Sequence, residues 1–256
     1  MELDRIKEKL RAGGVENADL EARWLCEALS GKALDDAVER RLSGYPLQYL
    51  LGEWDFCHET YEVSEACLIP RADTELLVLR AAALLPQGAR FLDLCTGSGC
   101  VAISLLAMRP DLSGVAVDLF EDTLALAARN AERNGVAERL TLLRSDVLQG
   151  PPEAIGQFDA LLSNPPYIRS DAIADLQREV GFEPRAALDG GEDGLIFYRA
   201  ILAQWRAVLG ESGQLLFEIG YDQADDLRAL ATRHGMCCEI ERDLGGNDRV
   251  ARLYYQ

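Results

Sequence analysis

A glycine-rich loop between an apolar strand and an apolar helix is the first feature with the spacing of a binding site. Gly97 to Ala102 read G-S-G-C-V-A, which fits G-x-G-x-x-A, and follow the apolar run at 90–94. Such a loop lets the backbone approach a ligand closely, and Asp118 ends the next apolar run, about 20 residues further on. A carboxylate there can accept hydrogen bonds from both hydroxyls of a ribose. The pattern predicts a site for a ribose-bearing cofactor, with a structural tight turn as the alternative, and does not choose between NAD and another such cofactor.

Two further acidic residues narrow the choice of cofactor. Asp93 lies within the first strand, and Asp93 to Gly99 read D-L-C-T-G-S-G, which resembles motif I of class I S-adenosylmethionine-dependent methyltransferases. Asp146 follows the third apolar run, where that family usually places the residue that contacts the adenine. Taken alone, Asp146 is equally well explained as an aspartate that caps a turn after a strand. Together with Asp118 and the loop, it favours a site for S-adenosylmethionine.

The sequence Asn164-Pro165-Pro166-Tyr167 ends a fourth apolar run. Proline has no N–H and cannot continue a central strand, so two prolines predict a rigid turn. Open parallel sheets bind ligands at the carboxyl ends of their strands, so this turn should face the reactive end of the cofactor. It resembles the (N/D/S)-P-P-(Y/F/W) sequence of methyltransferases that act on planar amide or amino nitrogens. An ordinary turn that ends a strand is the alternative.

The groups in this turn suit an amide nitrogen, whose lone pair is delocalised. The Asn164 side-chain oxygen and the Pro165 carbonyl can accept hydrogen bonds from the two N–H groups of the substrate. Tyr167 can stack on the planar group. Most of the rate would then come from positioning and fixed dipoles, and no strong general base is needed if the proton leaves after methyl transfer.

Five segments decide which nitrogen is the acceptor. In chain order they are IPRADTELLV (69–78), NPPYI (164–168), EPRAALDGGEDGL (183–195), FEIGYDQ (217–223) and DLGGNDRV (243–250). The set resembles the PrmC/HemK family of peptide chain release factor N5-glutamine methyltransferases, and YPLQYLLGEWDF (45–56) is similar to the bridge between that family's helical and catalytic domains. The resemblance covers the chain from about residue 42 onward. It implies methylation of the glutamine in the Gly-Gly-Gln loop of class I release factors, which modulates translation termination.

The resemblance also assigns roles to individual residues. Cofactor binding is implied for Cys95, Thr96, Gly97, Ser98, Gly99, Asp118, Asp146, Val147 and Asn164. Substrate binding is implied for Asn164, Pro165, Pro166 and Tyr167, and the catalytic candidates among them are Asn164, Pro165 and Tyr167. Cys95, Ala72 and Val147 depart from the family pattern, where a glycine, a proline and an aromatic residue are frequent. None of these departures removes a catalytic group.

Two of the segments carry open alternatives. Arg71, Asp73 and Glu75 fit a helix N-terminus, where acidic side chains stabilise the helix, or else the edge of a substrate channel. The glycine-rich segment 183–195 fits a simple turn before a helix or a loop over the active site. We predict the loop, because functional loops gather at this edge of such sheets.

The elements that must position these residues follow from the hydrophobic pattern. From residue 90, short apolar runs alternate with helical segments, which predicts parallel βαβ units. The last two apolar runs, near 237–243 and 249–255, flank the turn-rich LGGND and suit an antiparallel pair. With the resemblance, this predicts an α/β, Rossmann-like class I methyltransferase fold, whose mostly parallel seven-stranded sheet has a C-terminal antiparallel strand.

The first 50 residues show the spacing of amphipathic helices and no strand pattern. We therefore divide the chain into three parts. They are a small all-helical N-terminal domain for substrate recognition (1–52), a linker with a hairpin (53–72) and an S-adenosylmethionine-dependent methyltransferase domain (73–256).

Composition argues against several other classes. The 256 residues contain no apolar run of membrane length and no apolar core of a signal peptide, so we expect a cytoplasmic protein that does not bind membranes. Seven cysteines without a CxxC spacing indicate reduced thiols. With only two histidines, neither a structural metal site nor a histidine-based triad is expected. We expect a monomer.

The net charge of −17 lowers the expectation of direct nucleic-acid binding, because duplex binders usually present a basic face. Three alternatives to a release-factor methyltransferase remain. A nucleic-acid adenine N6-methyltransferase predicts a basic groove, and a nicotinamide-dependent oxidoreductase leaves the proline turn unexplained. A non-enzymatic binding module built on the N-terminal helices leaves a complete cofactor site unexplained.

Overall fold

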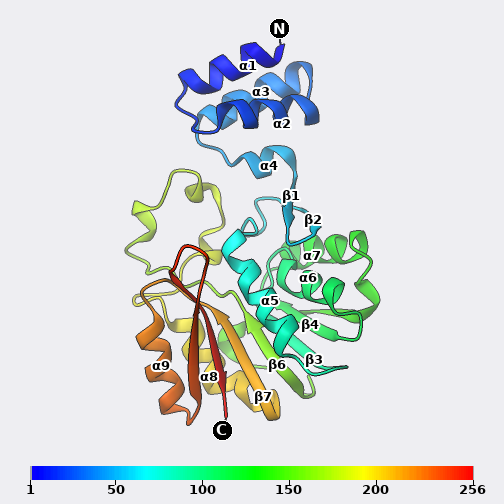
Figure 1. The fold of residues 1–256 in the computed structure, drawn as a ribbon, viewed down its shortest axis with the longest axis vertical. Coiled ribbons are helices and arrows are strands. Elements are labelled where there is room, and N and C mark those ends of the chain that lie inside the picture. The colour runs from blue at the N-terminus through cyan, green and yellow to red at the C-terminus, as the bar shows by residue number, and fades with distance from the viewer. Residues whose placement is uncertain (1, 256) are drawn as a thin grey trace.

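The computed structural model describes residues 2–255, and its first part is a small bundle of helices. Figure 1 shows α1 to α3 at one end of the molecule and the short α4 between them and the rest. The bounds are α1 Glu2–Ala12, α2 Ala18–Ala28, α3 Gly31–Leu42 and α4 Leu47–Leu51. Ile6 and Leu10 lie one turn apart on α1, and both are fully buried with Leu25 and Leu34. The bundle therefore has a hydrophobic core of its own.

A two-stranded hairpin, β1 (Glu53–Phe56) and β2 (Glu59–Glu62), follows the bundle, as the sequence predicts for this region. Its buried side chains Phe56 and Tyr61 belong to the core of the second part of the chain. The Tyr61 hydroxyl lies 2.6 Å from Ser104 Oγ on α6 (Cys100–Met108). The hairpin therefore packs against the core of the second part, and it also meets the helical bundle, because the Trp54 ring of β1 lies 5.9 Å from the Trp24 ring of α2.

The centre of the second part is a seven-stranded sheet with the order β5-β4-β3-β6-β7-β9-β8. Its strands are β3 Arg90–Leu94, β4 Ser113–Asp118, β5 Leu140–Arg144, β6 Phe158–Ser163, β7 Leu209–Glu218, β8 Cys237–Arg242 and β9 Asp248–Tyr254. The strands β5, β4, β3, β6 and β7 are parallel to one another, and β9 is antiparallel to both of its neighbours, β7 and β8. The predicted fold class is confirmed. After β3 the chain adds β4 and β5 on one side, and it then adds β6 and β7 on the other side, so the strand order reverses between β3 and β6. Folds of this kind bind ligands at such a point, at the carboxyl ends of the strands.

Helices cover both faces of the sheet (Figure 1). The helices α5 (Glu75–Leu84), α6 and α7 (Glu121–Arg133) contribute to one face, and α8 (Ile196–Gln204) and α9 (Ala224–Arg233) cover the other. Because side chains alternate along a strand, Phe91 packs in the first core and Leu92 in the second. None of the described helices is both long enough and apolar enough to cross a membrane.

A bridging segment, residues 170–189, connects the sheet edge to the N-terminal helices. It contains the short 3-10 helices η4 Ile173–Asp175, η5 Val180–Phe182 and η6 Arg185–Ala187. In Figure 1 it appears in yellow-green and reaches toward α4. Arg41 Nη2 of α3 lies 2.7 Å from Glu179 Oε1, and the rings of Tyr45 and Phe182 lie 5.3 Å apart. The N-terminal helices and the second part of the chain thus touch through this segment.

Candidate active site

The glycine-rich loop connects β3 to α6 with three residues in the left-handed region. Gly97 and Gly99 have φ values of 57° and 83°, and Cys95 has a φ of 60°. For a residue with a side chain this conformation costs about 1 kcal/mol or more, so Cys95 stands where glycine would be unstrained. A side chain at Gly99 would meet Ile103 Cδ1 at 2.7 Å. Gly99 therefore allows the loop to pack on α6 and does not itself line the cavity described below.

Asp118 ends β4 and holds the loop from its other side. Its Oδ2 accepts a hydrogen bond from Gly97 N at 3.0 Å, and its Oδ1 accepts one from Phe120 N at 3.2 Å. Burial raises the pKa of this carboxyl, and the backbone N–H groups oppose that rise. Each oxygen keeps a further lone pair for a ligand hydroxyl.

Asp146 and Val147 follow β5. Asp146 Oδ1 accepts a hydrogen bond from Leu148 N at 2.9 Å and so caps the short helix η3 (Val147–Gln149). The Val147 carbonyl accepts one from Trp205 Nε1 at 2.8 Å. Both residues also line the cavity, so Asp146 caps the short helix and at the same time belongs to the cavity wall.

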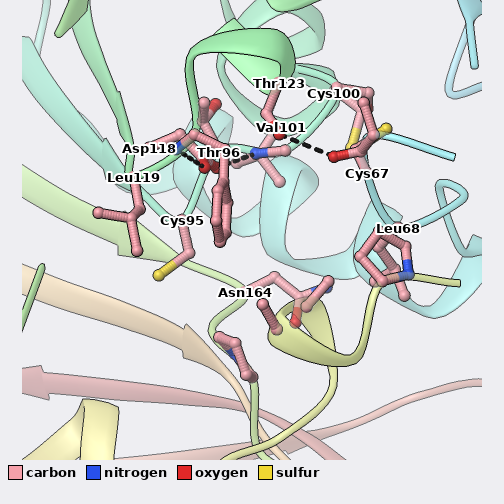
Figure 2. A pocket seen from close by; sticks show the side chains of 18 of the residues that line it. Cys67, Leu68, Cys95, Thr96, Cys100, Val101, Asp118, Leu119, Thr123 and Asn164 are labelled. Carbon is pink, nitrogen blue, oxygen red and sulfur yellow. Dashed lines mark hydrogen bonds between the residues drawn. The ribbon is translucent and has the colours of Figure 1, made fainter. Parts of the chain in front are cut away.

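One cavity of about 300 Å³ joins these elements at the carboxyl edge of the sheet. Figure 2 shows Asp118 and Asn164 on opposite sides of it. The predicted residues that line it are Cys95, Thr96, Gly97, Ser98, Asp118, Asp146, Val147, Asn164 and Pro166. The remaining predicted site residues, Gly99, Pro165 and Tyr167, are not among the lining residues.

The polar groups of the cavity suit a cofactor with hydroxyls and a positive charge. Ser98 Oγ is buried and has no hydrogen-bond partner among the described residues. Asp93 accepts a hydrogen bond from Thr96 Oγ1 at 2.6 Å, and burial raises the pKa of its carboxyl to about 7. Burial, with Asp118 and Asp93 nearby, raises the pKa of the Cys95 thiol. That thiol therefore stays protonated and acts as an uncharged wall.

The proline turn forms the opposite wall. Asn164 donates from Nδ2 to Thr74 Oγ1 at 3.1 Å, so its Oδ1 is the end of the amide left for a ligand. Among the described residues, no hydrogen bond engages the Pro165 carbonyl. Asn164 and Pro166 line the cavity, whereas Pro165 and Tyr167 do not. This alternation is the period of an extended chain, in which successive side chains point to opposite sides.

Tyr167 differs from the expectation that its ring stacks on the substrate. Its side chain packs against the second core, and its hydroxyl donates to Glu218 Oε1 at 3.2 Å. Burial raises the pKa of Tyr167, and the nearby Glu218 adds to the rise. Tyr167 thus supports the turn from behind.

The glycine-rich segment 183–195 braces the turn at very short range. Ile168 pairs with Asp189 in a parallel bridge, and Gly190 N donates to Ile168 O at 2.8 Å. A side chain at Gly194 would lie 2.4 Å from Tyr167 O. Gln223 Nε2 donates to the same oxygen at 3.0 Å. The segment also contributes Pro184, Ala186, Ala187 and Asp189 to the cavity wall.

Arg71, Asp73 and Glu75, at and before the start of α5, do not share one environment. Arg71 lines the cavity and is paired with the buried Glu183, whose Oε2 accepts from Ile69 N at 3.0 Å. Asp73 and Glu75 do not line the cavity, and Glu75 Oε1 accepts from Cys57 N at 2.9 Å. Sequence reasoning singled out neither Thr74 nor Glu183, although both lie within the motif segments.

Comparisons with known proteins show what this chain is similar to. The family model of the methyltransferase small domain matches residues 72–180. A release factor glutamine methyltransferase from Geobacter sulfurreducens is 39% identical, over 97% of this chain and 93% of that protein. One from Nitratidesulfovibrio vulgaris is 40% identical, over 96% and 92%. A methyltransferase structure from Pyrococcus furiosus superposes with a TM-score of 0.56 at 19% identity, over 76% of this chain and 87% of that one, which shows the fold alone.

Proposed function

The chain belongs to the release factor glutamine methyltransferases, and from that premise we propose its reaction. A methyl group passes from S-adenosylmethionine to the side-chain amide nitrogen, N5, of the glutamine in the Gly-Gly-Gln motif of class I peptide chain release factors, and this modification modulates translation termination. The single observation that carries the proposal is the pair of free acceptors beside the cofactor cavity. They are Asn164 Oδ1, whose residue lines the cavity, and the carbonyl of the adjacent Pro165, which is not itself among the lining residues.

The residues around the glycine loop would hold the cofactor. Asp118 would accept from the ribose hydroxyls, and the unpartnered Ser98 Oγ would bond a polar group of the cofactor. Asp146 and Val147 would flank the adenine, where the small Val147 gives less stacking area than an aromatic residue. S-adenosylmethionine supplies a methyl group on a positively charged sulfur, which the acidic cavity favours electrostatically.

The turn would hold the substrate. Asn164 Oδ1 and the Pro165 carbonyl would accept from the two N–H groups of the glutamine amide, which fixes its plane and raises the electron density on nitrogen. Prolines on both sides of that carbonyl keep the acceptors rigid, so little reorganisation is needed at the moment of transfer. The proton of the methylated nitrogen is lost to solvent afterwards, and Tyr167 contributes by supporting the turn.

The N-terminal helices would recognise the body of the release factor, with the enzyme acting as a monomer and without direct nucleic-acid contact. Arg41 is buried, paired with Glu21 at 2.5 Å and with Glu179 at 2.7 Å. Since Glu179 belongs to the bridging segment, and later residues of that segment line the cavity, a partner held by the helices would contact the segment that forms part of the cavity wall. The net charge of −17 fits a protein partner better than a phosphate backbone.

A methyl-transfer assay tests the proposal. Recombinant release factor, the same factor with its Gly-Gly-Gln glutamine changed to glutamate, and duplex DNA or RNA are each incubated with the enzyme and labelled S-adenosylmethionine. We expect label in the unmodified release factor alone, located on the glutamine by mass spectrometry. Label in nucleic acid would instead support the adenine methyltransferase. An enzyme that binds the cofactor but labels none of the three would refute the proposal.

A further inference from the structure

A buried network behind the proline turn is not used by the contacts proposed above. Its members come from four segments that are distant in the sequence: Thr74 of η1 (Ala72–Thr74), Tyr167 of the turn, Glu218 at the end of β7 and Arg249 of β9. Glu218 is 1% exposed, and among the described residues its Oε2 has no hydrogen-bond partner. A carboxylate with an unpaired oxygen is costly in a protein interior, so a structural explanation of Glu218 is incomplete.

Polar groups from several other elements lie around Glu218. The Tyr167 hydroxyl donates to its Oε1 at 3.2 Å, and the Tyr198 hydroxyl of α8 donates to its backbone carbonyl at 2.7 Å. Burial raises the pKa of Glu218 to about 7, while the Thr74 hydroxyl and the positive charge of Arg249 oppose that rise. Thr74 is thus a polar neighbour of the carboxyl, but among the described residues the Tyr167 hydroxyl is the group hydrogen-bonded to it, and Oε2 has no hydrogen-bond partner.

Arg249 and two aspartates complete the charges of the network. Arg249 Nη2 lies 3.3 Å from Asp73 Oδ2 and 3.1 Å from Asp243 Oδ2. The negative charge of Asp73 raises the pKa of Glu218 further. Arg249 is therefore shared among three carboxyl groups, and Glu218 is the one of them that is fully enclosed.

Thr74 links this network to the turn, because Asn164 Nδ2 donates to Thr74 Oγ1 at 3.1 Å. A hydroxyl has a single proton to donate. While Thr74 accepts from Asn164, that proton must point elsewhere, and an ionised carboxyl at Glu218 attracts it strongly in the low dielectric of the interior.

We propose that Glu218 is a positioning residue that sets the orientation of the Asn164 amide through Thr74. With Glu218 ionised, Thr74 directs its proton toward the carboxylate and can only accept from Asn164, so Asn164 turns Nδ2 to Thr74 and Oδ1 to the substrate. If the Thr74 proton turned toward Asn164, the amide would flip and present N–H groups to a substrate amide that is itself a donor. The inference rests on the proposed function, because it assumes that Asn164 Oδ1 holds the substrate amide.

The first test is the variant Glu218→Gln, which keeps the size of the side chain and removes its charge. Steady-state kinetics with release factor and S-adenosylmethionine are measured from pH 6 to pH 9. We expect kcat of the wild type to rise as the pH increases through about 7, where Glu218 ionises. We expect Glu218→Gln to lose that rise and to have a kcat about 10- to 100-fold lower at pH 8, the effect of misdirecting one fixed dipole. The KM for release factor and the Kd for the cofactor should change by no more than about two-fold.

Two variants at Thr74 separate orientation from packing. Thr74→Ser keeps the hydroxyl and should keep both the wild-type kcat and its pH dependence. Thr74→Val removes the hydroxyl and should lose both, and the double variant with Glu218→Gln should be no worse than Thr74→Val alone. Because Thr74→Val leaves the carboxyl in place, it carries the test if Glu218→Gln does not fold. Tyr198→Phe, which removes only the bond to the backbone carbonyl of Glu218, should leave the pH dependence unchanged.

The outcomes distinguish this inference from the function on which it rests. If the wild type labels no release factor, the proposed function fails. If the wild type is active and Glu218→Gln retains its kcat and its rise near pH 7, only the inference fails. In that case the rise belongs to another group such as Asp93, whose pKa is also about 7.

Discussion

Replacing Glu218 by glutamine should stabilise the folded protein at pH 8 while it impairs catalysis. The reason is that burial makes the folded state bind a proton at Glu218 more tightly than the unfolded chain does, since its pKa rises from 4.5 to about 7. A group with a raised pKa contributes its full stabilisation below pH 4.5 and loses it as the pH rises to about 7. Above pH 7 the wild type therefore holds a charge that the fold disfavours.

The expected size follows from that pKa. The difference between 4.5 and about 7 corresponds to roughly 3 kcal/mol, and most of it, about 2 to 3 kcal/mol, is lost between pH 5 and pH 8. In a chain of this size, 1 kcal/mol shifts Tm by about 2 to 4 °C, so the variant should gain about 5 to 10 °C over the wild type on going from pH 5 to pH 8. Arg249 keeps two acidic partners after the change, because Asp73 and Asp243 lie within 3.3 Å of it.

Thermal unfolding of both proteins at pH 5, 6, 7 and 8 measures this effect. The quantity of interest is the difference in Tm between variant and wild type, because titration of all other carboxyl groups cancels in that difference. It should increase with pH and level off above pH 7. A difference that stays constant across the range, or a variant that becomes relatively less stable at high pH, would show that the folded state does not disfavour the ionised form of Glu218.

The remaining predictions concern the two walls of the cavity. Asn164→Ala should lower the single-turnover rate about 100-fold or more, with the cofactor Kd from calorimetry nearly unchanged. Asp118→Ala should instead raise that Kd about 10- to 100-fold, since it removes the ribose acceptor and frees Gly97 N. Gly194→Ala should reduce both stability, by about 1 to 3 kcal/mol, and kcat, because its new methyl group would overlap Tyr167 O. Gly135→Ala is the matched control, because Gly135 has a φ of 69° and open space around it. Denaturant unfolding should show a loss of about 1 kcal/mol in the free energy of unfolding, and kcat should not change.

The sheet, the glycine loop and the proline turn could be predicted because each has a local signal. Compact apolar runs alternating with helical segments indicate parallel strands, and the turn-rich LGGND indicated the antiparallel pair of β8 and β9. Once the strand order follows, the carboxyl ends of β3, β4, β5 and β6 must meet at one edge. That is why most of the predicted cofactor residues line a single cavity.

The direction of individual side chains and the contacts between distant segments could not be predicted in the same way. Tyr167 was expected beside the substrate, but the extended backbone after Asn164 turns it to the opposite side. Thr74 and Asn164 are 90 residues apart, and Tyr167 and Glu218 are 51 apart, so no local pattern pairs them. One signal was available: Glu218 is an acidic residue in the otherwise apolar run LLFEIG, and a strand buried on both faces rarely carries a charge without a role.

The acceptor pair of the turn explains the reaction better than it explains the choice of substrate. Asn164 Oδ1 and the Pro165 carbonyl match any planar NH₂ group, and an adenine offers one as well as a glutamine does. Selection must therefore come from groups further from the reacting nitrogen. The bridging segment connects the two regions, because Glu179 contacts the N-terminal helices through Arg41, and Pro184, Ala186, Ala187 and Asp189 further along the segment line the cavity. If the N-terminal helices bind the release factor as proposed, the bound factor would contact the same segment whose residues line the cavity.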